Sequence, residues 1–269
     1  MILDGPVRTF LDKIGFAATL PVLGRVGWGL AASQGWLGTG TFSPLHLTGL
    51  NASVAVTEET VWGGSAMYPW PTADQQPWLV SSSVNDDGAP AGTGAWVVRV
   101  WWMNSVGVEA YEDVTLNGVG NVQMVASTVR RINRAEVLTC GVTGSNEGTI
   151  TIYATDAATV IGVIPPLNTT ATGVGALNGC YQTVPAGYQD VLQQFHCHAI
   201  DSAGRYRLLV RTTSTSPWIP KAWSYPYSYT APIQLPPLVI PAGADYMVVS
   251  LGTAAGYGWA GLTGWREPT

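Results

Sequence analysis

Residues 94–153 place the strongest constraint on the fold, because short β-forming runs alternate there with turns. Residues 95–103 and 131–138 are rich in β-branched and aromatic side chains, and Asn117-Gly118 and residues 144–148 have the composition of turns. Strand-like runs separated by turn signals every 8–12 residues, roughly, are typical of antiparallel β-sandwiches. Residues 45–269 contain no convincing helical period. The sequence therefore predicts an all-β chain.

The composition divides the chain into three parts. We predict an extended N-terminal arm over residues 1–45 and two antiparallel, jelly-roll-like β-sandwiches in series, over residues 46–164 and 165–269. The boundary is placed at Pro165-Pro166, which begins a run rich in Asn, Thr and Gly. In the second half, two Pro-Ala-Gly turns each precede a strand-like segment.

The predicted arm is apolar and rich in glycine. A transmembrane helix needs about 20 unbroken apolar residues, and Pro21 and Arg25 interrupt the most apolar part of the arm. We expect the arm to dock on a neighbouring subunit, because its large apolar side chains need a cover. The predicted contacts are Phe16, Trp28, Trp36 and Leu37. An arm folded back on its own domain would meet the same need.

Composition also narrows the class of partner. Only 11% of the 269 residues are charged, and the chain contains 32 Gly, 18 Pro and 12 Trp. A surface poor in charge and rich in aromatic area is more typical of a protein covered by its neighbours in an assembly. A robust sandwich with Ser-, Thr- and Gly-rich loops is the alternative. The net charge of -5 argues against a nucleic-acid partner, which requires a basic face.

Cysteine and histidine give little evidence of a metal or disulfide framework. Cys140, Cys180 and Cys197 cannot all pair within one chain, which favours an intracellular folding compartment. On a strand, the two histidines of His196-Cys197-His198 would share one face and the cysteine would point to the other. Two histidines are half a zinc site at best, so no metal is predicted.

The remaining motifs are also explained without catalysis. Gly256, Gly258 and Gly261 match the spacing of a dinucleotide fingerprint, but that motif requires a following helix, which the sequence does not predict. Asp86-Asp87 is explained as a turn, and Glu112-Asp113 as a solvated strand edge. We therefore predict neither a cofactor nor an enzymatic activity.

A second group of candidates comprises arginines and aromatic loops. On a strand, Arg130 and Arg134 would face one way and Arg131 the other, and an inter-subunit salt bridge is one use for them. The aromatic side chains stand beside prolines, which favours rigid interface loops over sugar-stacking platforms. The predicted interface residues in these loops are Trp62, Tyr68, Trp70, Trp218, Trp223 and Tyr225.

Several phrases of the sequence resemble one protein family. Residues 81–86, 92–95, 112–118, 131–135 and 148–152 resemble virion structural proteins of tailed phages that infect aquatic bacteria, including cyanophages. The resemblance extends from about residue 61 to residue 269. It implies a location in the virion, assembly in the host cytoplasm, and the major capsid protein or other virion proteins as partners.

Two functional hypotheses follow from the resemblance and the composition. The first is a capsid decoration (cement) protein, a homotrimer that stabilises the head by bridging capsid subunits, with no nucleic acid and no membrane as partner. The second is a receptor- or carbohydrate-binding module of a tail fibre or vertex spike. Exposed tryptophans lining a groove beside a carboxylate would favour the second hypothesis. A glycan hydrolase is disfavoured, because no acid pair is apparent beside an aromatic cleft.

Overall fold

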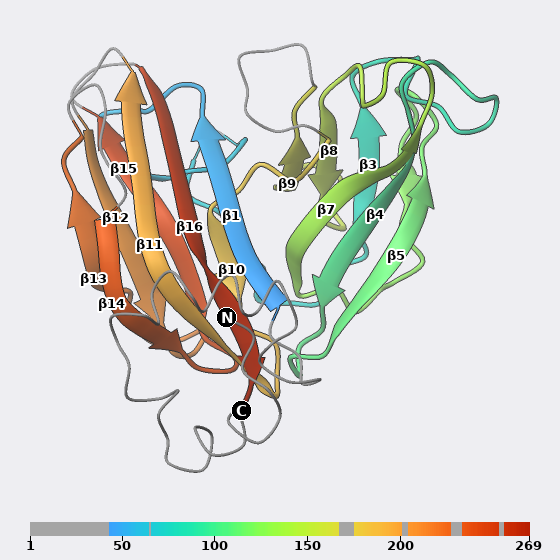
Figure 1. Cartoon of the computed structure of the whole chain (residues 1–269). Helices are drawn as coiled ribbons and strands as arrows, with labels where there is room; N and C mark the ends of the chain where they lie inside the picture. The colour runs from blue at the N-terminus through green and yellow to red at the C-terminus, as the bar shows by residue number, and fades with distance from the viewer. Residues whose placement is uncertain (1–42, 65, 167–174, 201–203, 227–232, 253–255) are drawn as a thin grey trace, which may run out of the picture.

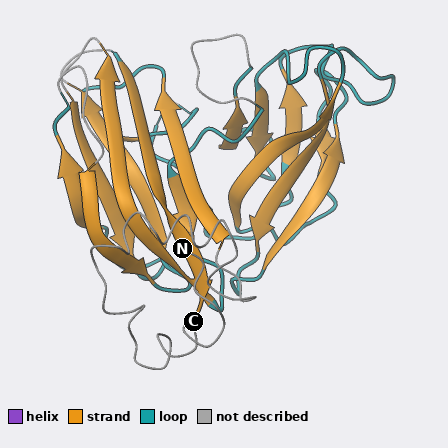
Figure 2. Cartoon of the chain, in the orientation of Figure 1, coloured by secondary structure: helices purple, strands orange, loops and turns teal. Residues whose placement is uncertain are grey.

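The computed structural model describes residues 43–64, 66–166, 175–200, 204–226, 233–252 and 256–269. These residues form sixteen β-strands and no helix (Figures 1 and 2). All strand pairs among them are antiparallel. The prediction of an all-β, antiparallel chain is confirmed. The described part of the chain has no helical span with the length and hydropathy of a membrane crossing.

The strands form four sheets, here called sheets I to IV. Sheet I has the order β1-β16-β11-β14, with bounds Ser43–Asn51, Tyr257–Pro268, Tyr188–Ile200 and Ile233–Ile240. Sheet II has the order β10-β15-β12-β13, with bounds Tyr181–Thr183, Asp245–Gly252, Gly204–Arg211 and Ile219–Ser224. The short strand β2 (Glu59–Thr60) also pairs with β15.

Sheets III and IV come from the middle of the chain and lie together on the other side of the molecule (Figure 1). Sheet III has the order β6-β3-β8-β9, with bounds Val122–Gln123, Trp78–Ser81, Ile150–Tyr153 and Val160–Ile164. Sheet IV has the order β5-β4-β7, with bounds Glu109–Thr115, Ala95–Met103 and Arg131–Cys140.

Each pair of sheets supplies its own hydrophobic core. Phe195 and Leu262 of sheet I cluster with Leu208 and Val248 of sheet II, and all four side chains are inaccessible to solvent. A separate cluster joins Leu79, Ile150 and Ile152 of sheet III to Val98 and Val100 of sheet IV. These positions alternate with more exposed ones along several strands, as expected when one face of a sheet is buried.

The sheets do not follow the chain in simple series. Strand β1 pairs with β16, and β2 pairs with β15, so both belong with the C-terminal sheets although residues 46–164 were predicted as one unit. Gly49 permits this crossing, because a Cβ there would lie 2.1 Å from the carbonyl oxygen of Val61 and 2.8 Å from the Cys180 nitrogen. Residues 1–42 of the predicted arm lie outside the described residues, and its last residues, 43–45, begin β1.

A third cluster joins the two sheet pairs. Met247 and Val249 lie on the face of sheet II that is turned away from the first core, and they pack against residues of the 62–70 segment. Val160, at the start of β9, and Leu177 pack on the same cluster. This part of the contact between the sheet pairs is therefore apolar and aromatic.

Candidate functional site

The aromatic segment 62–70 is buried within its own chain. Trp62, Tyr68 and Trp70 are 3%, 2% and 7% exposed. The Tyr68 ring stacks on Tyr181 with centroids 3.9 Å apart and meets Trp62 edge-on at 5.3 Å. Trp70 in turn lies 5.2 Å from the half-buried Trp218. Burial raises the pKa of the Tyr68 hydroxyl well above its usual range.

This packing corrects the prediction that Trp62, Tyr68 and Trp70 are anchors for a partner or platforms for a sugar. Sheet II already covers their rings, so a partner cannot reach them in this fold. The sequence signal was a proline-flanked aromatic loop, which has the same composition whether it covers its own sheet or a neighbour's. Phe16, Trp28, Trp36 and Leu37 lie outside the described residues.

Two predicted interface residues are strongly exposed. Trp223, on β13, is 65% exposed and Tyr225, just after it, is 67% exposed. Ile219 and Lys221 are exposed on the same strand, and together these four residues are called the β13 strip. Among the described residues β13 pairs only with β12, so the strip lies at the edge of sheet II.

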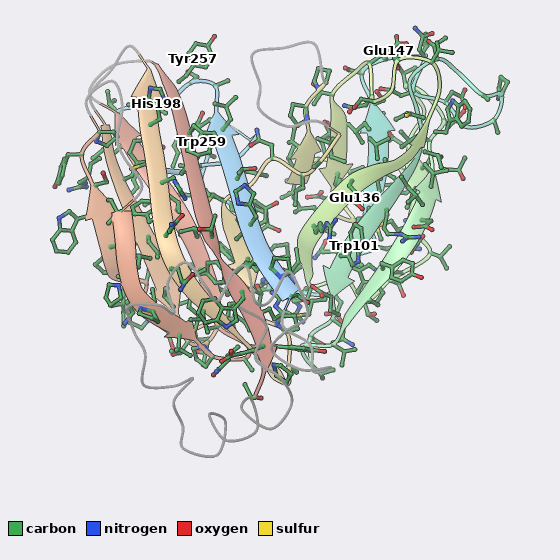
Figure 3. The ribbon with its side chains drawn as sticks, viewed as in Figure 1. Trp101, Glu136, Glu147, His198, Tyr257 and Trp259 are labelled. Atoms are coloured by element: carbon green, nitrogen blue, oxygen red, sulfur yellow. The ribbon has the colours of Figure 1, made fainter. Side chains whose placement is uncertain are left out.

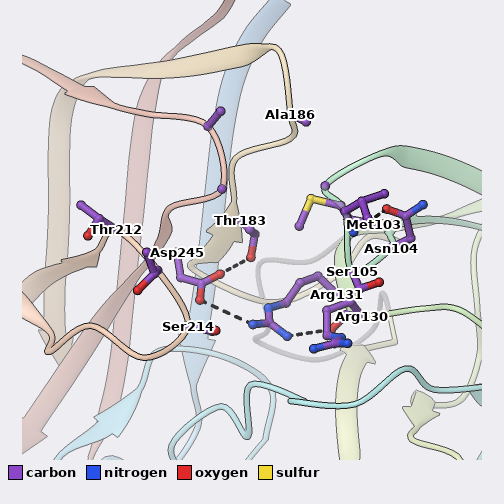
Figure 4. Close-up of a pocket in the computed structure, with 15 residues that line it drawn as sticks. Met103, Asn104, Ser105, Arg130, Arg131, Thr183, Ala186, Thr212, Ser214 and Asp245 are labelled. Atoms are coloured by element: carbon purple, nitrogen blue, oxygen red, sulfur yellow. Dashed lines mark hydrogen bonds and ion pairs between the residues drawn. The ribbon is translucent and has the colours of Figure 1, made fainter.

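A hollow lies where loops of the two sheet pairs meet (Figure 4). It has a volume of about 470 Å³. One wall is formed by the β4–β5 connection and the start of β7, and the other by the loops around residues 183–186, 212–214 and 242–245. We call it the junction pocket.

Three charged side chains form an ion cluster at the junction pocket. Asp245, 2% exposed, accepts a hydrogen bond from Arg211 Nε at 2.8 Å and lies 2.6 Å from Arg211 Nη2. Its other oxygen accepts from the Thr183 hydroxyl. Arg131 is 3.5 Å from Asp245 and is 6% exposed. The prediction that Arg131 and Arg134 face opposite ways is consistent with this burial, because Arg134 is exposed.

A second ion cluster lies beside the first. Asp190, which is inaccessible to solvent, pairs with Arg266 at 2.7 Å and accepts from the Tyr246 hydroxyl at 2.9 Å. Arg266 also lies 3.6 Å from Glu109 of sheet IV. Asn133 Nδ2 donates to Glu109 at 2.9 Å and to the Thr183 carbonyl at 3.0 Å, which links the two clusters.

The other predicted arginines also bind carboxylates of their own chain. Arg130 donates to Asp74 at 2.9 Å, and Arg134 pairs with Glu136 at 2.5 Å. Both arginines therefore have an acceptor within their own chain, and an inter-subunit salt bridge stays a prediction. Such exposed pairs contribute little to stability.

The face of sheet IV that carries Trp101 (labelled in Figure 3) has a ladder of rings and guanidinium groups. Trp101 lies between Arg134, 4.3 Å from its centroid, and Arg99, at 5.8 Å. Arg99 also lies 4.4 Å from the Tyr111 ring and pairs with Asp113 at 2.6 Å, which lowers the pKa of that carboxyl. Asp113 lies on β5, an edge strand of sheet IV, as its sequence context predicts.

The His-Cys-His run follows the predicted alternation. Cys197 is 1% exposed and packs in the core, whereas His196 and His198 are half-buried on the other face of β11. His196 meets Trp259 with ring centroids 6.2 Å apart. Figure 3 labels His198 and Trp259 on sheet I. No group of three His, Cys, Asp or Glu side chains among the described residues is arranged to hold a metal ion.

The Asp86-Asp87 turn contains a buried carboxylate that the sequence does not reveal. Asp86 is inaccessible to solvent and accepts four hydrogen bonds of 2.5–2.9 Å. The donors are the Ser81 hydroxyl and the backbone N–H groups of Ala95, Glu147 and Gly148. Because every contact is internal, this carboxylate organises loops rather than a ligand site.

Comparison with known proteins gives little further information. No protein-family model matches the chain, and no curated protein matches it. Two chains from structures of infectious bursal disease virus align weakly. The Gt-strain chain has 10% identity over 84% of this chain and 71% of its own, with a TM-score of 0.19. The Gx-strain chain has 9% identity over 86% and 76%, with a TM-score of 0.16. Scores this low do not indicate a common fold.

Proposed function

We propose that this chain is a non-enzymatic structural protein of a virus particle and that it contacts a neighbouring virion protein through the β13 strip. The observation that carries the proposal is the exposure of Trp223 and Tyr225, at 65% and 67%, side by side at the edge of sheet II. The resemblance to virion structural proteins of tailed phages supplies the biological setting.

The chemistry of the strip suits a protein partner. Tryptophan and tyrosine are the residues most enriched at the energetic centres of interfaces, and large exposed rings are otherwise unfavourable in water. Pro220 and Lys221 lie on the same edge strand, and both disfavour the addition of another strand there. The partner is therefore expected to contact side chains rather than extend the sheet.

The finer proposal is a capsid cement protein built from two jelly-roll-like sandwiches. Cement proteins act by burying apolar area across joints between capsid subunits, at about 25 cal/mol per Å² before the costs of association. A homotrimer would multiply the weak contact of one strip through avidity. The major capsid protein is the partner that this role requires.

Particles that lack the protein provide the test. The wild-type protein and the Trp223→Ser/Tyr225→Ser double variant would be added to such particles, and binding and rupture temperature measured. Binding with a raised rupture temperature is expected for the wild type and not for the double variant. The control is Tyr111→Ser, which removes a ring that is 58% exposed on sheet IV and should leave binding intact. Light scattering on the free proteins would report whether trimers form.

One observation favours the receptor-binding alternative. Trp101 and Tyr111 lie on the outer face of sheet IV near Asp113 and Glu136, a combination found in sugar sites. The faces of both rings are, however, contacted by arginine guanidinium groups. Binding of the wild-type protein to host cells or glycans, lost in Trp101→Ser and not in the β13-strip variant, would replace the cement proposal.

A further inference from the structure

The guanidinium group of Arg131 is buried but incompletely paired. Its Nη1 donates to the carbonyl oxygens of Pro71 and Arg130. Nη2 comes no closer than 3.5 Å to Asp245, and Nε has no hydrogen-bond partner among the described residues. The Nε–Nη2 edge is the one through which arginine makes two-point pairs with carboxylates. In Arg131 this edge lacks a close acceptor.

Asp245 does not fill this edge, because it is already bound by other donors. One of its oxygens is held by Arg211 at 2.6–2.8 Å, and the other by the Thr183 hydroxyl. The guanidinium groups of Arg131 and Arg211 surround the single carboxylate of Asp245, so the cluster has a local charge of +1. The whole chain has a net charge of -5. The neighbouring acidic side chain Glu109 does not line the junction pocket. A buried charge without a counter-charge is unfavourable, so an added anion would relieve it.

The junction pocket gives such an anion room and polar neighbours. Arg131 and Arg130 line it, and its volume is about 470 Å³. Ser105 and Ser214 lie on its wall and are exposed, so their hydroxyl groups are available to a ligand. Pockets between packed units are a common location for small-molecule sites.

We infer that the junction pocket binds a small organic acid through a single carboxylate. One carboxylate oxygen accepts a hydrogen bond from Arg131 Nη2, and the second oxygen pairs with Nε after a small shift of the side chains that cover this buried atom. A single negative charge matches the local charge of +1. A doubly charged phosphate would leave an excess negative charge beside Asp245. This inference is independent of the proposed virion role.

The test titrates the full chain with acetate, glucuronate and glucose at constant ionic strength, with chloride as the balancing anion. The unfolding midpoint and the NMR signal of the Arg131 Nε–H group are measured. Both acids are expected to raise the midpoint saturably and to shift that signal, because a ligand that binds the folded state stabilises it. Glucuronate should act at lower concentration, since its hydroxyl groups can reach Ser105 and Ser214 on the wall. Glucose should have no effect.

Variants assign the effect to the pocket. Arg131→Met should raise the Kd for glucuronate by about tenfold or more. Arg134→Gln is the matched control, because Arg134 lies on β7 away from the pocket, where it pairs with Glu136 at 2.5 Å, and it should retain binding. If Arg131→Met fails to fold, Ala242→Phe fills the pocket from an exposed wall position and should abolish the response. An acid response that survives either folded variant, an unshifted Arg131 signal, or an equal response to glucose would overturn the inference.

Discussion

His196 shows how a half-buried surface residue makes the fold sensitive to pH. Its Nε2 atom is buried without a hydrogen-bond partner among the described residues. Desolvation by burial, aided by the nearby His46, lowers the pKa of His196 below that of a histidine in the unfolded chain. Protonation therefore favours the unfolded state.

The sign of the pH dependence follows from this shift. The unfolded chain binds more protons as pH falls below its ordinary histidine pKa, about 6.5, so the free energy of unfolding should decrease from there down through the lowered pKa. His196→Gln should flatten this decrease, and His46→Gln should reduce it in part. Urea unfolding midpoints between pH 5 and pH 7.5 measure the effect. An unchanged slope in His196→Gln would contradict it.

At the scale of elements, Asp86 holds three loops in register. Its carboxylate ties the end of β3, the start of β4 and the turn before β8 together. In Asp86→Asn, an NH2 group would replace one carboxylate oxygen and face at least one backbone N–H donor. The hydrogen bonds that this oxygen accepts would be lost. We expect the free energy of unfolding to fall by about 3 kcal/mol or more.

The neighbouring acid supplies the control for this prediction. Asp87 accepts one hydrogen bond, from the Ala89 N–H at 2.8 Å, and is half-buried. Asp87→Asn should therefore cost about 1 kcal/mol or less. Chemical denaturation of the two variants distinguishes them. Equal losses of unfolding free energy in the two variants would mean that the four hydrogen bonds of Asp86 do not act as a unit.

Individual strands were well predicted from sequence, whereas their partners were not. The strands predicted at residues 95–103 and 131–138 correspond to β4, Ala95–Met103, and β7, Arg131–Cys140. Both are marked by local β-branched and aromatic residues and by nearby turns. The pairing of β1 with β16 joins residues more than 200 positions apart, and an alternating pattern specifies a buried face but not the strand beside it.

The candidate sites show the same difference between what the local sequence reveals and what the tertiary fold decides. Exposed Trp223 and buried Trp70 both lie close to prolines in the sequence, and they differ because Trp70 packs against sheet II. The junction pocket was not predicted, because Arg131 and Asp245 belong to different sheets and neither lies in a recognisable motif. Residue type identified possible contacts, but the tertiary fold decided which of them solvent can reach.

For the whole molecule, the main question is whether the two sheet pairs unfold together. They share the aromatic cluster around Tyr68, and the linked ion clusters join sheet IV to sheets I and II through Asn133 and Glu109. Contacts that are both apolar and hydrogen-bonded favour a single cooperative transition. We therefore expect tryptophan fluorescence and far-UV circular dichroism of the wild type to give the same unfolding midpoint.

Trp62→Ala tests this coupling, because its ring packs against both Tyr68 and Tyr181 at the contact between the sheet pairs. Loss of the ring should lower the free energy of unfolding by about 3–5 kcal/mol. It should also separate the two transitions, since each sheet pair keeps its own core. Trp223→Ala, which removes an exposed ring, should cost about 0.5 kcal/mol or less and leave one transition. If Trp62→Ala still unfolds in one step, the Trp62 ring is not needed to couple the two sheet pairs. If the wild type already unfolds in two steps, the sheet pairs are thermodynamically independent, and the aromatic cluster only sets their orientation.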